Sequence, residues 1–172
     1  MLASGFGHVS PKWVLHIANR PDLPEFHHDD FRVLAEGEVA SIIQNTSNHW
    51  RKVFSIMAKI SFALYDTGCE SWQQYRDTKL LTGAGFEALN YLHYAKEGAD
   101  NYFSIVAGFQ YAATQLNLDK LITHQSTSKL LRIEGRDCIV TPYFDWRQLN
   151  NELLDKLIGV MSSSMLKNTV DK

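Results

Sequence analysis

The residues after the apolar run Cys138–Thr141 combine aromatic and charged side chains within a few positions. The run is typical of a buried strand, and Pro142 ends it because proline has no backbone N–H for a sheet hydrogen bond. Loops at strand ends often carry binding groups, and aromatic rings beside an arginine can stack on a planar base. The candidate ligand-binding residues of this loop are Tyr143, Phe144, Trp146 and Arg147.

The same loop also has a purely structural interpretation. Asp145 and Gln148 have the spacing of a helix capping pair, so the last helix is expected to begin near Asp145. Trp146 and one further aromatic ring would then fill the core, and Arg147 would be solvated. Both interpretations remain open from the residues alone.

A second candidate site is the segment from Gly83 to Ala88, which matches the G-x-G-x-x-A form of a dinucleotide-binding turn. We expect a strand at Lys79–Thr82 before it and a helix at Phe86–Lys96 after it. Gly83 and Gly85 would then present backbone N–H groups to a phosphate. The alternative is that both glycines serve a tight turn and close packing.

The segment between Pro21 and Phe31 is polar and broken by prolines, which predicts a loop. Its run His27-His28-Asp29-Asp30 carries side chains that bind metals, but neighbouring loop residues cannot all reach one ion without help from elsewhere. We therefore assign no metal site, and a solvated loop or a lid is the competing interpretation. The sequence indicates no cofactor.

The elements that position these candidates alternate between strands and helices. A strand is expected at Trp13–Ala18 and a hairpin over Lys129–Thr141, with helices at Gly37–Gln44, from His49 onward, and at Tyr102–Leu116. This pattern predicts one α/β domain with three α/β/α layers and a short, mostly parallel central sheet. Ligands of such sheets bind beyond the carboxyl ends of the strands. Residues 162–172 are expected to be a frayed tail.

Three segments resemble the uracil-DNA glycosylase superfamily: Val14–Pro21, Lys79–Leu89 and Cys138–Pro142. That superfamily has a compact α/β/α domain whose catalytic and base-binding groups lie on loops that leave parallel strands. The resemblance implies that Asn19 holds the attacking water and that the loop Pro142–Asp145 enters the DNA minor groove.

The resemblance also implies that Phe26 or Phe31 stacks on a flipped base. Tyr143 and Phe144 follow Pro142, where the superfamily carries a histidine that steadies the uracil oxygen. The implied function is therefore base or nucleotide recognition with reduced or altered activity. Two alternatives are a non-catalytic nucleotide-binding module that uses the Gly83–Gly85 turn and a protein–protein interaction domain.

Composition sets the remaining limits. The 172-residue chain has a formal net charge of −2, which creates no strong field toward phosphate backbones or anionic lipid. Cys69 and Cys138 are too far apart in sequence for a paired metal or redox motif, which favours free thiols in a reducing compartment.

No segment is apolar enough for a signal peptide or a membrane span, so a cytoplasmic protein is expected. The partner classes that fit are a nucleobase, a nucleotide or nucleic acid, and the homo-oligomeric state is open.

Overall fold

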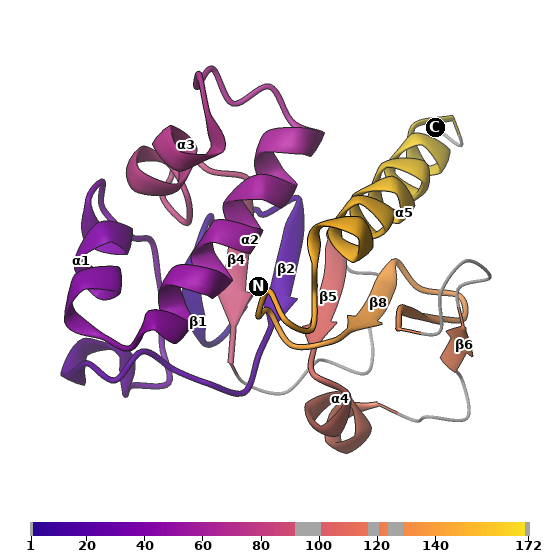
Figure 1. Cartoon of the computed structure of the whole chain (residues 1–172), viewed down its shortest axis with the longest axis horizontal. Helices are drawn as coiled ribbons and strands as arrows, with labels where there is room; N and C mark the ends of the chain where they lie inside the picture. Colours follow the sequence, from indigo (N-terminus) through magenta and orange to yellow (C-terminus); the bar gives the residue numbers. More distant parts are fainter. Residues whose placement is uncertain (1, 92–100, 117–120, 124–128, 171–172) are drawn as a thin grey trace.

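The computed structural model describes residues 2–91, 101–116, 121–123 and 129–170. Within these ranges, eight strands form one sheet in the order β3-β1-β4-β2-β5-β8-β7-β6 (Figure 1). In chain order they are β1 (Gly5–Gly7), β2 (Trp13–His16), β3 (Phe31–Arg32), β4 (Glu87–Asn90), β5 (Phe103–Ala107), β6 (Leu121–Thr123), β7 (Leu131–Ile133) and β8 (Cys138–Thr141).

The four central strands, β4, β2, β5 and β8, run parallel to one another. The outer pairs are mixed: β1 is antiparallel to β4 and parallel to β3, while β7 is antiparallel to both β8 and β6. Each central strand is buried along its whole length, as expected for parallel strands with both faces covered. The predicted α/β class with a mostly parallel sheet is confirmed.

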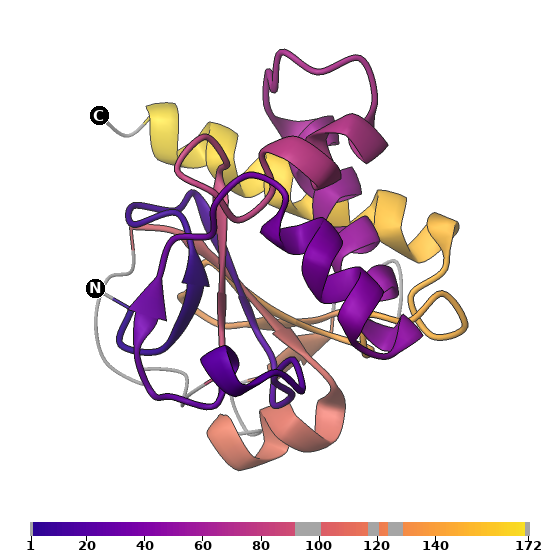
Figure 2. The same ribbon diagram turned by 90° about the vertical axis from the view of Figure 1, so that its left-hand side faces the viewer.

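Helices cover the two faces of the sheet unequally. α1 (Glu38–Asn45), α2 (Asn48–Leu64), α3 (Trp72–Thr78) and α5 (Asn151–Val170) lie together on one face (Figure 2). α4 (Phe109–Gln115) packs on the opposite face. In the described residues, the second helical layer therefore consists of α4, whose Ala112 joins a small apolar cluster with Val106, Ile133, Cys138 and Val140.

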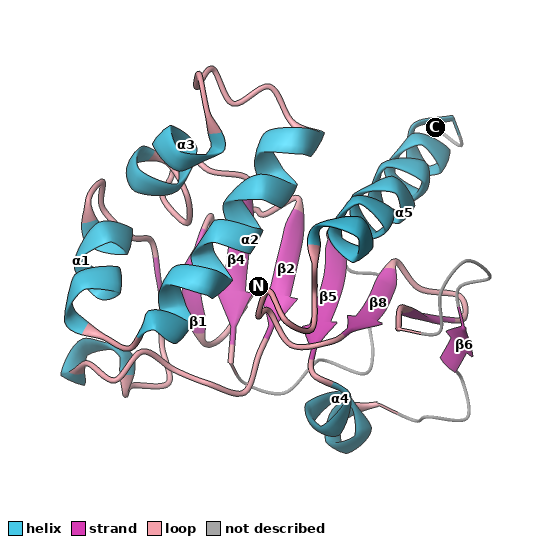
Figure 3. Cartoon of the chain, viewed as in Figure 1, coloured by secondary structure: helices cyan, strands magenta, loops and turns pink. Residues whose placement is uncertain are grey.

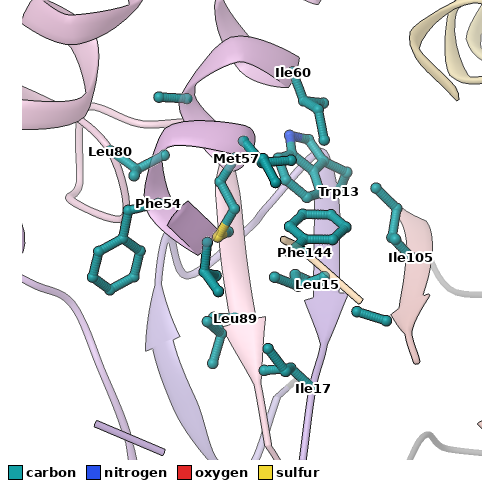
Figure 4. Close-up of a cluster of buried hydrophobic side chains, with 14 of the residues drawn as sticks. Trp13, Leu15, Ile17, Phe54, Met57, Ile60, Leu80, Leu89, Ile105 and Phe144 are labelled. Carbon is teal, nitrogen blue, oxygen red and sulfur yellow. The ribbon is translucent and has the colours of Figure 1, made fainter. Parts of the chain in front are cut away.

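The main core lies between the sheet and α2. One face of β2 and β5 contributes Trp13, Leu15 and Ile105, and the inner face of α2 contributes Phe54 and Met57 (Figure 4). All five side chains are fully buried. Burial of one large apolar side chain contributes about 1.5–3 kcal/mol, so this layer holds α2 firmly against the centre of the sheet.

The predictions with a strong local pattern are confirmed. The first strand, the helix near residues 37–44, the long helix from about residue 49 and the hairpin after residue 129 correspond to β2, α1, α2 and β7–β8. The hairpin turn contains Gly135 with a positive φ of 71°, a conformation that favours glycine. Cys69 and Cys138 are not joined in a disulfide; Cys138 is buried, whereas Cys69 is only half-buried.

The segment after Gly85 corrects the predicted strand and helix. Residues 79–81 form a turn rather than a strand, and only Thr82 makes an isolated bridge, to Leu34. Residues 87–90 are strand β4, not the start of a helix, and residues 92–96 of the predicted helix lie outside the described residues. The prediction was wrong because Glu87 and Asn90 are polar residues that are buried in the sheet, which no local pattern indicates.

Two further boundaries differ from the predictions. The helix predicted over residues 102–116 is strand β5 followed by α4, and Gly108 between them has a positive φ of 96° that breaks a continuous helix. The last helix begins at Asn151, where the Asn150 side chain accepts a hydrogen bond from the Leu153 N–H at 3.0 Å. α5 then continues to Val170, so residues 162–170 of the tail that was expected to fray are helical.

Candidate functional site

The carboxyl ends of the four parallel strands lie at one edge of the sheet, where the arrowheads of β4, β2, β5 and β8 point in Figure 3. Asn19 follows β2, Tyr91 follows β4, Gly108 follows β5 and Tyr143 follows β8. We call this set the strand-exit edge. The sequence prediction that Asn19 and Tyr143 share one end of the molecule agrees with this topology.

Arg20 lies on the β2 side of the strand-exit edge. Its guanidinium lies 4.3 Å from the centre of the Tyr91 ring and donates hydrogen bonds to the His28 carbonyl and the Asp29 carboxylate. These contacts fold the loop after β2 back over the end of β4. Asn19, the preceding residue, is exposed.

The two aromatic residues of this segment, Phe26 and Phe31, differ in burial. Phe26 is 2% exposed and packs edge-on against Phe6 at 5.2 Å between ring centres. The Arg32 guanidinium lies 4.8 Å from the centre of the Phe26 ring. Phe31 is half-buried in strand β3. The Phe26 ring therefore belongs to the core, and this placement does not support the predicted stacking of Phe26 on a base.

His49 and Tyr143 form the β8 side of the strand-exit edge. The Tyr143 hydroxyl lies 2.7 Å from His49 Nε2, and the two rings are stacked with centres 5.1 Å apart. Burial lowers the pKa of His49 and raises the pKa of Tyr143, so both side chains are neutral near pH 7. The hydroxyl can then donate to an unprotonated imidazole nitrogen. His49 begins the first turn of α2 and was not among the predicted site residues.

The rest of the loop after β8 divides into core and surface. Phe144 is fully buried in the main core, which excludes it as a ligand contact, whereas Arg147 is exposed. Trp146 is half-buried, and its ring centre lies 4.2 Å from Lys59 Nζ. Asp145 is not the cap of the last helix, because its carboxylate forms an ion pair with Lys52 at 2.6 Å and accepts a hydrogen bond from the Arg147 N–H. The structural interpretation holds for Phe144, while ligand binding by Tyr143, Trp146 and Arg147 stays a prediction.

The Gly83–Gly85 turn does not present a phosphate cradle. The Ala84 N–H donates to Thr82 Oγ1, and the Gly85 N–H donates to the Thr82 carbonyl. A Cβ on Gly85 would lie 2.7 Å from the Lys79 carbonyl oxygen, so this glycine is required for close packing. A strand follows the turn, and no helix N-terminus faces outward there. The structural interpretation of Gly83 and Gly85 is the one that fits.

A buried carboxyl group lies at the opposite, amino end of β4. Glu87 is fully buried and accepts hydrogen bonds from the Ser61 and Tyr75 hydroxyls and from the Leu81 N–H. Burial raises the pKa of Glu87, against the opposing effect of these donors. The group fastens α2, α3 and the turn before β4 to the sheet, and it lies away from the strand-exit edge.

Sequence reasoning missed a polar cluster at the ends of β2 and β4. His16 Nε2 lies 3.2 Å from Ser104 Oγ, and His16 Nδ1 lies 3.3 Å from Asn90 Nδ2. All three side chains are buried, and burial lowers the pKa of His16 to about 3, so the imidazole is neutral. The only local signal was a histidine within an apolar strand. The cluster sets the geometry of adjacent strand ends beneath the strand-exit edge.

The histidine- and acid-rich loop has no metal-binding geometry in the described residues. Asp29 binds Arg20, and His27 lies 3.5 Å from Asp22 on the surface. Within the described ranges, no three histidine, cysteine or acidic side chains gather in a group that could hold a metal ion. Likewise, none of the helices in the described part of the chain is long and apolar enough to cross a membrane.

One family model matches residues 4–162, which is most of the chain. The chain belongs to DUF6942, a family of unknown function. Neither a curated protein nor a solved structure matches it. For this member of DUF6942, functional inference therefore depends on the site geometry.

Proposed function

We propose that this protein recognises a nucleobase or nucleotide at the strand-exit edge. The observation that carries the proposal is the shared edge of β2 and β8, which are separated in the sheet only by β5. This topology puts Asn19 and the Tyr143–His49 pair at the same end of the molecule. Sheets of this kind bind ligands beyond the carboxyl ends of their parallel strands.

The chemistry of the edge suits a flat, polar ring. The Asn19 carboxamide offers both a donor and an acceptor, which is what the edge of a base requires. At the same edge of the sheet, the stacked Tyr143–His49 pair and the Arg20–Tyr91 pair each add a planar surface. The resemblance to the uracil-DNA glycosylase superfamily supports the same placement of Asn19.

The proposal is recognition rather than efficient base excision. Tyr143 and Phe144 stand where that superfamily has its histidine, and Phe144 is fully buried. A residual excision activity would use Asn19 to orient a water molecule toward the sugar carbon of the glycosidic bond, with the released base as leaving group. The proposal requires binding and does not require turnover.

The test is a thermal-shift screen with free nucleobases, nucleosides and nucleoside monophosphates. A ligand present at about 100 times its Kd stabilises the native state by about 2.7 kcal/mol, which is a shift of several degrees in Tm. Asn19→Ala and Tyr143→Phe are expected to reduce that shift. The matched controls Asn151→Ala and Tyr65→Phe lie outside the strand-exit edge and should leave the shift unchanged. The absence of a shift with every compound would contradict the proposal.

A further inference from the structure

A second surface begins beside the strand-exit edge and includes the two half-buried lysines of α2, Lys52 and Lys59, which lie seven residues apart on the same side of the helix. Ser55, between them, is buried. Half-buried Trp146, from the loop after β8, and half-buried Trp72, from α3, lie on either side of Lys59. We call Lys52, Lys59, Trp72 and Trp146 the α2 ridge.

Lys59 is the central residue of the α2 ridge. Its Nζ lies 4.2 Å from the ring centre of Trp146 and 5.1 Å from that of Trp72. No acidic side chain pairs with Lys59 in the described residues, whereas Lys52 pairs with Asp145. A cation between two indole rings therefore keeps its charge available to an external anion.

Arg76 extends this cationic surface. Its guanidinium lies 5.6 Å from the centre of the Trp72 ring, donates to Ser55 Oγ at 3.2 Å and pairs with Asp77. Of the three cations on the ridge and Arg76, Lys52 and Arg76 pair with the acids Asp145 and Asp77. The charge of Lys59 is the one that no acid of the described residues pairs with.

We infer that the α2 ridge binds a single-stranded stretch of nucleic acid. Single-strand sites combine cations that follow the phosphates with aromatic side chains on which bases stack. Lys52 and Lys59 are about 10 Å apart along the helix axis at 1.5 Å per residue, a distance that a short length of strand can span. The inference rests on the proposed function, because it makes the recognised base part of a polymer.

The ridge is continuous with the strand-exit edge. His49 contacts Tyr143 at the start of α2, and Lys52 lies less than one turn further along the same helix. A strand with one base at Tyr143 would therefore carry its neighbouring nucleotides along α2 toward Trp72. The large apolar side chains exposed in the described residues, Val9, Val33, Phe109 and Leu166, are not on the ridge, so the surface suits a charged polymer better than an apolar protein partner.

The experiment compares a labelled thymidine 15-mer with thymidine monophosphate by fluorescence anisotropy and tryptophan quenching. We expect the 15-mer to bind at least tenfold more tightly and to quench tryptophan emission, because Trp13 and Trp50 are buried whereas both ridge tryptophans are accessible. Trp72→Leu should weaken 15-mer binding roughly tenfold, and Trp72→Phe should restore most of it.

The charge is tested separately. Lys59→Gln should lower the slope of log affinity against log salt by about 0.7, the value for one phosphate contact on a single strand. Lys156→Gln, which removes a surface lysine paired with Glu152 on α5, is the matched control and should leave the slope unchanged.

Three results would overturn the inference: no binding of the 15-mer, equal effects of Lys59→Gln and Lys156→Gln, or equally tight binding of poly-glutamate without quenching. The proposed function fails independently. If ridge variants weaken the 15-mer while free bases and monophosphates do not bind, only the strand-exit proposal is lost. If Asn19→Ala weakens mononucleotide binding and the ridge variants change nothing, only the ridge is lost.

Discussion

The carboxyl group of Glu87 shows how much one buried polar residue can determine. It receives hydrogen bonds from α2, α3 and a turn, and Ser61 in turn accepts a hydrogen bond from Trp13 Nε1 at 2.9 Å. A network of this kind is stable only when every member has a partner. It therefore specifies the registration of two helices on the sheet.

Glu87→Gln should destabilise the fold by about 1–3 kcal/mol, because both carboxyl oxygens accept hydrogen bonds, Oε2 from Ser61 and Tyr75 and Oε1 from the Leu81 N–H, and an amide nitrogen at either place cannot. Urea unfolding at pH 7 measures the change. Glu152→Gln, which alters an exposed carboxylate on α5, serves as the control and should leave the midpoint unchanged. Equal midpoints for wild type and Glu87→Gln would show that the network does not support the fold.

His16 gives the protein a defined pH dependence. Burial lowers its pKa from 6.5 to about 3, so the unfolded chain binds a proton in this window and the folded chain does not. The stability from the neutral imidazole is present above pH 6.5 and is lost as the pH falls toward 3, at up to about 1.4 kcal/mol per pH unit.

Between pH 7 and pH 5, wild type should lose about 2 kcal/mol more unfolding free energy than His16→Gln. Urea titrations at the two pH values give both differences. His28→Gln changes an exposed histidine and should retain the wild-type pH dependence. If His16→Gln retained it as well, the buried imidazole would not be its source.

At the scale of elements, two residues are candidates for the N-cap of α5, Asp145 and Asn150. Asp145 holds a turn through the Arg147 N–H, whereas the Asn150 side chain accepts from Leu153 within the helix itself. Asn150→Ala should cost about 1 kcal/mol of stability, the usual value of a lost N-cap.

Thermal or urea unfolding of Asn150→Ala checks this assignment, and Asn151→Ala, one position further along, is the matched control. The Asn151→Ala substitution is expected to have a smaller effect, because Asn151 is the first residue inside the helix. A larger loss of stability for Asn151→Ala than for Asn150→Ala would show that Asn150 is not the helix cap.

At the scale of the whole molecule, α5 connects parts of the fold that are distant in sequence. Its last turns bring the buried Ser164 to Asp137, at the start of β8, and Met165 to the Tyr65 hydroxyl, at the end of α2. These contacts link the β7–β8 turn to the main helical layer. Residues 162–165 are therefore part of the folded structure.

Truncation of the chain after Met161 should lower the free energy of unfolding by about 2 kcal/mol, from one lost hydrogen bond and lost apolar burial. Chemical unfolding of the truncated and full chains measures it. Ser164→Ala in the full chain should account for part of the loss. Identical midpoints for both chains would mean that the end of α5 is a frayed tail after all.

The amino-acid sequence alone determined the elements whose signals are local. The helical spacing of Val53, Phe54 and Met57 indicates α2 without any knowledge of its neighbours. The apolar run Trp13–His16 and the glycine turn at Gly135 likewise identify β2 and the β7–β8 hairpin. Because parallel strands end at a common edge, the predicted parallel sheet was also enough to put the ends of β2 and β8, and so Asn19 and Tyr143, at one edge of the sheet.

Only the tertiary structure decided which polar residues are buried and which aromatic residues are core. Glu87 and Asn90 belong to a central strand because Ser61, Tyr75 and His16 satisfy them, and those partners are distant in sequence. The sequence likewise contained Tyr143, Phe144 and Trp146 as one cluster, but folding separates them. Phe144 points into the core, Tyr143 stacks on His49, and Trp146 lies against Lys59 of α2. The physical reason is that burial depends on the contacts between elements, which spacing along one chain segment does not specify.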